Sequence, residues 1–124
     1  MPHTTVGKIE SMKILYGDSG DIIDQFKIGD GTNPITSNNT DLGSPISYGS
    51  PTPSELHPIN GHSLDEPTRT MESSCIVTTT DYQGNVSEWG LFSTSGIMIM
   101  GDGFPTYAKD GNTNLKFIGR DRHL

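Results

Sequence analysis

The sequence has little cysteine, little positive charge and no long apolar run, and each of these shortages argues against a class of protein. It has one cysteine in 124 residues, Cys75, so no disulfide can form within the chain. Positive charge is scarce, since eight Lys and Arg stand against fifteen Asp and Glu, a net charge of −7. Such a charge repels phosphate backbones and anionic headgroups, which argues against nucleic-acid and membrane-surface roles. There is no apolar run of membrane-spanning length and no secretory leader pattern, so we expect a chain kept in a reducing cytosol.

Apolar residues are scarce too, at 31% of the chain, whereas glycine (15) and proline (8) are abundant. A length of 124 residues fits a single domain, residues 1–124, with one modest core. A thin core gains stability when neighbouring subunits bury additional apolar surface. We therefore expect an oligomer or a component of a larger assembly.

A short helix is predicted over residues 4–16, with Thr4 or Thr5 as its N-cap. The apolar positions that define its buried face are Val6, Ile9, Met12 and Tyr16. A glycine-rich turn follows, and it ends the helix.

Most of the remaining pattern indicates β-strands. The predicted strands cover residues 21–28, 70–80, 86–92, 97–100 and 114–118. Phe26 and Ile28 face the core in the first strand, and Phe117 does so in the last. Short turns join the middle three strands, which predicts an antiparallel meander, with a turn at residues 101–103 after it. The predicted fold is mainly β, a small antiparallel β-sandwich or barrel-like module.

The proline-rich residues 49–69 show no helix or strand period, so we predict a long loop there. We weigh two interpretations of this loop equally: a surface loop without a binding role, and a contact arm for partner subunits. The residues proposed for such contacts are Tyr48, Pro51, Pro53, His57, Pro58 and His62. Residues 119–124 are expected to form a charged tail.

Two patterns resemble chemical sites but lack the necessary partners. The tetrapeptide Gly17–Gly20 matches the motif around the nucleophile of trypsin-like serine proteases, which would make Ser19 a nucleophile. No histidine stands in a recognisable partner motif, and that scaffold is much longer than this chain. His57 and His62 have a spacing that fits no zinc pattern, so we expect exposed loop histidines, with a metal shared across an oligomer axis as the alternative. We predict a non-enzymatic protein without a catalytic, cofactor or metal site.

The stretch Glu88–Phe92 contains the only tryptophan and has two distinct faces. Trp89 and Leu91 share one face and are expected to supply the core, while Trp89 as an interface residue is the alternative. Gly90 lets a neighbouring strand or chain approach closely. Glu88, if buried, needs a partner. The candidates are backbone N–H groups or the guanidinium of Arg69, Arg120 or Arg122.

This Glu-Trp-Gly-Leu-Phe tract resembles a signature of small structural proteins of tailed bacteriophages, among them tail-fibre, tail-collar, neck and baseplate components. The order of flanking segments is similar as well: residues 26–31, 40–45 and 74–85 before the tract, and 97–100, 104–109 and 115–118 after it. The resemblance implies a non-enzymatic virion protein, assembled in the host cytoplasm, that acts through oligomerisation and contacts with other virion proteins.

Two alternatives remain open at this point. A receptor- or glycan-binding tip module needs clustered exposed aromatic residues, and Tyr48, Tyr82 and Tyr107 are the candidates. A capsid decoration protein would share the fold but occupy symmetric positions on a capsid.

Overall fold

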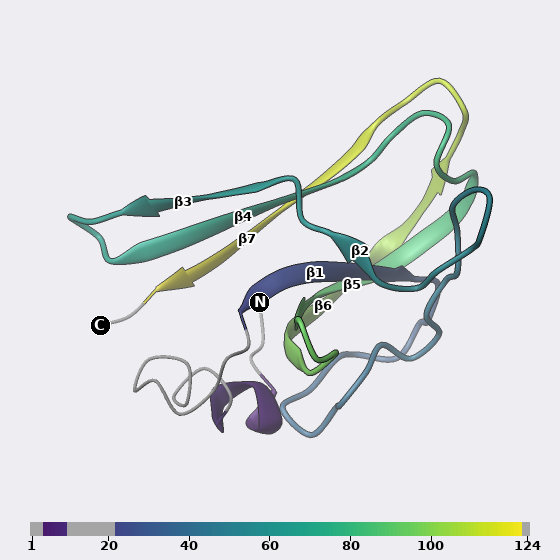
Figure 1. Ribbon diagram of the computed structural model, residues 1–124. Helices are drawn as coiled ribbons and strands as arrows, with labels where there is room; N and C mark the ends of the chain where they lie inside the picture. Colours follow the sequence, from purple (N-terminus) through teal and green to yellow (C-terminus); the bar gives the residue numbers. More distant parts are fainter. Residues whose placement is uncertain (1–3, 10–21, 123–124) are drawn as a thin grey trace.

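A computed structural model describes residues 4–9 and 22–122, and it shows two antiparallel sheets and one short helix (Figure 1). The first sheet has the order β2-β1-β5-β6, and the second has the order β3-β4-β7. The strands are β1 (Ile23–Gly29), β2 (His57–Pro58), β3 (Gly61–Asp65), β4 (Thr70–Val77), β5 (Gly84–Ser93), β6 (Met98–Lys109) and β7 (Leu115–Arg122). The prediction of a mainly β, sandwich-like fold is confirmed.

The main core lies between the two sheets. The side chain of Trp89 is 6% exposed, and its ring stacks on that of Phe117 in β7 with centroids 4.9 Å apart. Gly119, also in β7, lets the two sheets approach closely, because a Cβ there would lie 2.7 Å from Leu91 Cδ1. Phe26 and Ile28 of β1 belong to the same core, as predicted.

A second, smaller core covers the other face of the first sheet. Residues 30–46, which we call the cover loop, lie on the side of β1, β5 and β6 away from β3, β4 and β7 (Figure 1). Ile35 and Leu42 of this loop pack with Phe92 and Met98. Strand β5 is therefore buried on both faces, which explains why eight consecutive residues of this strand are buried.

Glycines let the cover loop lie directly on the sheet. Gly90 and Gly101 are cross-strand partners in β5 and β6. A Cβ at Gly90 would lie 3.4 Å from Leu42 Cδ2, and one at Gly101 would lie 3.1 Å from Ile35 Cγ2. The predicted role of Gly90 in close approach is confirmed, and the neighbours include β6 and the cover loop of the same chain.

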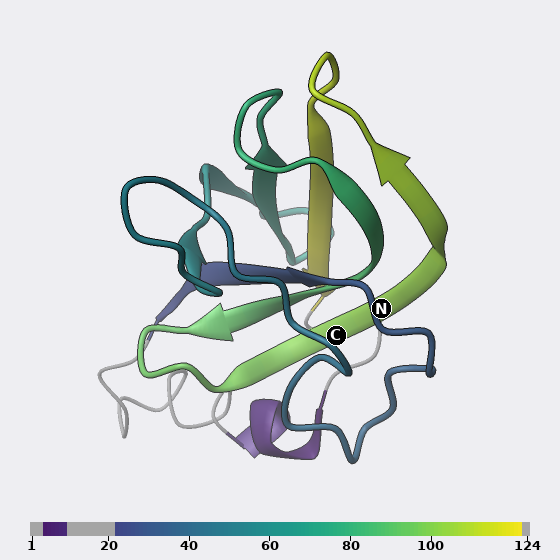
Figure 2. The same ribbon diagram turned by 90° about the vertical axis from the view of Figure 1, so that its right-hand side faces the viewer.

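The predicted meander is only partly correct. β5 and β6 form a hairpin, whose turn uses Gly96 at a φ of 91°. β4, however, pairs with β3 and β7 and not with β5. Its buried residues face the first sheet, so the chain crosses between sheets after Val77 (Figure 2). A meander would have placed β4 in the same sheet as β5, without this second layer.

Three predicted boundaries are also wrong. The turn expected at residues 101–103 lies inside β6, because these residues continue the pairing with β5. Residues 49–69 contain β2 and β3, so that segment is not one continuous loop. The expected tail at 119–124 continues β7 as far as Arg122.

The helix is described only over residues 5–9, and the rest of the predicted helix lies outside the described residues. Thr4 is its N-cap, since its hydroxyl accepts the Gly7 N–H at 2.7 Å. The predicted buried face is wrong where it can be seen, because Val6 and Ile9 are 43% and 52% exposed. Thr4 makes the contact with β6 instead. Within residues 4–9 and 22–122, no helix is long and apolar enough to cross a membrane.

Candidate functional site

The carboxylate of Glu88 joins β5 to both ends of the cover loop. The side chain is fully buried, and it accepts N–H groups from Gly31 at 3.2 Å, Gly43 at 3.0 Å and Ser44 at 2.7 Å. Of the predicted partners, the backbone N–H groups are the correct ones. Arg120 pairs elsewhere, with Glu72.

The cover loop needs glycine where it meets this carboxylate. A Cβ at Gly29 would lie 2.2 Å from Glu88 Oε1, and one at Gly31 would lie 2.8 Å from the same atom. The Ser87 hydroxyl donates to the Gly31 carbonyl at 2.5 Å, next to the carboxylate. This segment of the loop is thus fixed by hydrogen bonds to two successive residues of β5.

Lys27 forms a second link between the sheet and its cover. Its side chain is largely buried, and Nζ lies 3.1 Å from Asp41 Oδ1 and 3.2 Å from Glu55 Oε1. Nζ also lies 4.7 Å from the centroid of the Phe92 ring. Lys27 is not predicted as a site residue from the sequence, because a lysine on the alternate face of a strand usually points to solvent. The available signal was the pair of aliphatic residues Ile35 and Leu42, which indicates a second core.

A cleft of about 430 Å³ opens between the cover loop and β6. Its lining residues are Gly31, Thr32, Asn33, Pro34, Ile35, Ser87, Asp102, Gly103, Phe104, Pro105 and Thr106. Asp102 is the one residue among them with an ionisable side chain. The sequence offered no signal for this cleft, since it depends on how the cover loop folds back.

The predicted contact residues divide into two groups. Tyr48 is buried and stacks on the His57 ring at 3.8 Å, so neither side chain is the free contact that was expected. His57 Nε2 also lies 2.7 Å from the Ser54 carbonyl oxygen. The other four residues are exposed: Pro51, Pro53, Pro58 and His62. The prediction is wrong for Tyr48 because this tyrosine fills the end of the main core.

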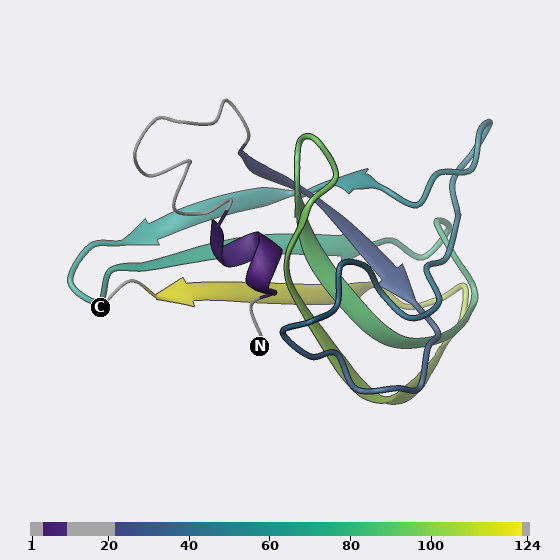
Figure 3. The same ribbon diagram turned by 90° about the horizontal axis from the view of Figure 1, so that it is seen from below.

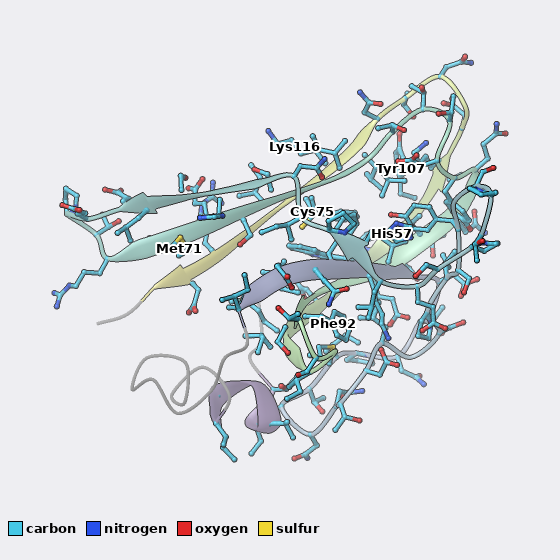
Figure 4. The ribbon with its side chains drawn as sticks, viewed as in Figure 1. His57, Met71, Cys75, Phe92, Tyr107 and Lys116 are labelled. Atoms are coloured by element: carbon cyan, nitrogen blue, oxygen red, sulfur yellow. The ribbon has the colours of Figure 1, made fainter. Side chains whose placement is uncertain are left out.

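No group of three His, Cys, Asp or Glu side chains within residues 4–9 and 22–122 is placed to bind a metal ion. Burial raises the pKa of the Cys75 thiol to about 12, so this thiol stays protonated at neutral pH. Figure 4 shows Cys75 between the sheets, on the side of the first sheet opposite Phe92. The Gly17–Gly20 motif lies outside the described residues.

The second sheet projects beyond the first and forms an arm, defined by residues 61–74 and 118–122 (Figures 1 and 3). Leu64 of β3 is 57% exposed, and its cross-strand partner Met71 is only partly buried. Figure 4 shows Met71 on the projecting part of the arm. Apolar side chains on an uncovered sheet face are typical of a surface that another molecule buries.

Comparison with known protein families, curated proteins and solved structures finds no match.

Proposed function

We propose that this chain is a non-enzymatic structural protein of a bacteriophage virion, a tail, neck, baseplate or fibre-attachment component. It acts through oligomerisation and contacts with neighbouring subunits. The virion setting is supported by the sequence resemblance alone. The assembly role is supported by the structure of the arm.

The observation that carries the assembly role is the arm at β3, β4 and β7, which extends beyond the strands of the first sheet. A β-sheet reaches independent stability when at least one of its faces is packed against something. On the arm, the face that carries Leu64 and Met71 continues the core face of β4 beyond the end of the first sheet. Burying this face against a second copy extends the core of a chain that has few apolar residues of its own.

Only one of the three aromatic candidates for the tip-module alternative is well exposed. Tyr48 is buried. Tyr82 is half-buried against the main core, with its ring centroid 6.1 Å from that of Tyr48. Tyr107 alone is well exposed, at 42%. One exposed tyrosine does not form the aromatic cluster that this alternative requires.

Light scattering of the purified full chain tests the proposal. We expect a particle several times the 13.4 kDa mass of one chain, and Leu64→Lys should shift it toward the monomer. The lysine places a charge on the surface that association buries, which is unfavourable without a partner.

Ile22→Lys is the matched control, because Ile22 is also 57% exposed but directly precedes β1 of the first sheet and is not part of the arm. This variant should keep the wild-type mass. A wild-type protein that stays monomeric at about 100 μM, well above typical assembly affinities, would overturn the assembly role. Equal dissociation of both variants would show that the arm is not the contact surface.

A further inference from the structure

The four sheet edges are not equally available for pairing with another chain. The edge at the start of β6 is capped, because the Thr4 N–H and hydroxyl donate to the carbonyls of Ile99 and Met98. Further along, β6 contains Pro105, which has no N–H to donate. β2 is two residues long and includes Pro58. These are the usual ways in which proteins protect a sheet edge.

The two edges of the second sheet lack these protections. β3 and β7 each pair only with β4 among the described strands, and neither contains proline. β7 is eight residues long, and no described strand pairs with its outer side. An added strand could therefore form a regular ladder at either edge.

The two edges also run in the same direction and carry opposite charge. β3 and β7 are both antiparallel to β4, so they are parallel to each other. The β4 register places Asp65 level with Arg122, Ser63 level with Arg120 and Gly61 level with Ile118. In sequence, β3 ends on the acidic Asp65, and β7 ends on Arg120, Asp121 and Arg122, two basic residues and one acidic.

We propose that copies of this chain join head to tail, with the β7 edge of one copy paired in parallel with the β3 edge of the next. This inference rests on the proposed assembly role and adds to it a contact at the strand edges of the arm, beside the face that carries Leu64 and Met71. If residues that are level within one chain stay level across the contact, Asp65 of each new copy lies next to Arg122 of the previous copy. In the same way, Gly61 of the new copy lies next to Ile118 of the previous copy. Such a contact is heterologous, so repetition gives a ring or an open chain of copies.

The alternative contact between two β7 edges is less favourable. Antiparallel pairing centred on Ile118 sets Lys116 of one copy opposite Arg120 of the other. Like charges that face each other directly across strands are destabilising. Head-to-tail pairing avoids this repulsion and brings the basic strand against the acidic one, which suits a chain with a net charge of −7.

Disulfide trapping in the full chain tests this contact. The double variant Gly61→Cys/Ile118→Cys places one thiol on each edge at the same level. A Cβ at position 61 meets no atom within 4 Å, and Ile118 is 40% exposed, so both sites accept the change. We expect mild oxidation to give a ladder of dimers, trimers and larger species on non-reducing gels, because every chain carries both halves of the contact.

The single variants and a pair with one thiol outside the proposed contact are the controls. Gly61→Cys or Ile118→Cys alone should give no ladder, and Gly61→Cys/Thr106→Cys should give only the background of random collisions. Efficient dimers from a single variant would show an isologous edge and would overturn the head-to-tail contact. Oligomers in light scattering without a ladder would overturn this contact but leave the assembly role standing, whereas monomers would overturn both.

Discussion

At the scale of single residues, Glu88 is the side chain on which most of the cover loop depends. Its three N–H donors belong to residues 44 to 57 positions away in sequence. A buried carboxylate without an ionic partner is stable only where several hydrogen bonds replace its hydration. The strand pattern indicates that Glu88 needs a partner, but it cannot identify amides that a distant loop brings into place.

Replacing Glu88 with glutamine should lower the free energy of unfolding by about 3 kcal/mol. The new amide group turns a donor toward backbone N–H groups, which leaves buried donors unpaired. Urea denaturation followed by Trp89 fluorescence measures the change.

Glu72→Gln is the matched control, because Glu72 pairs with Arg120 on a partly exposed surface. Surface ion pairs contribute about 0–1 kcal/mol, so this variant should differ little from wild type. Equal losses in the two variants would contradict a structural role for the Glu88 hydrogen bonds.

At the scale of elements, alternation locates most strands but does not pair them. β4 was located correctly because Cys75 and Val77 alternate with more exposed residues. The strand predicted to pair with β4 was wrong. Strands that follow each other in sequence usually pair, but here the chain changes sheet between β4 and β5. β3 gave no signal because four of its five residues are exposed, so its strand conformation depends on β4 alone. The Gly-Asp-Gly of β6 has turn composition, but pairing with β5 keeps it extended.

The close approach of the two sheets at β7 gives a prediction at this scale. Gly119→Val should lower the free energy of unfolding by about 1–3 kcal/mol, because the added carbons overlap Leu91 and Trp89 and force the sheets apart. Thermal and urea unfolding of the variant measure the loss.

Gly61→Val makes the same chemical change in the same sheet, where the space is open. It should stay within about 0.5 kcal/mol of wild type. If both variants lost the same stability, the cost would come from the glycine backbone and not from packing between the sheets.

At the scale of the whole molecule, the chain compensates for its few apolar residues by using β5 twice. One face of β5 builds the core shared with β3-β4-β7, and the other face builds the core under the cover loop. The arm is the opposite case, because its strands extend beyond the first sheet. Stability is therefore expected to be highest in β5 and lowest in β3.

Hydrogen exchange followed by mass spectrometry tests this order and connects it to assembly. In dilute protein, peptides from β5 should exchange slowest, through opening that approaches global unfolding, and peptides from β3 should exchange fastest, through local opening. If β3 and β7 edges join between copies, raising the protein concentration should slow exchange in β3 and β7 and leave exchange in β5 unchanged. The reason is that association stabilises only the amides that it covers. Exchange in β3 that is as slow as in β5 at every concentration would contradict both the layered core and the exposed edge.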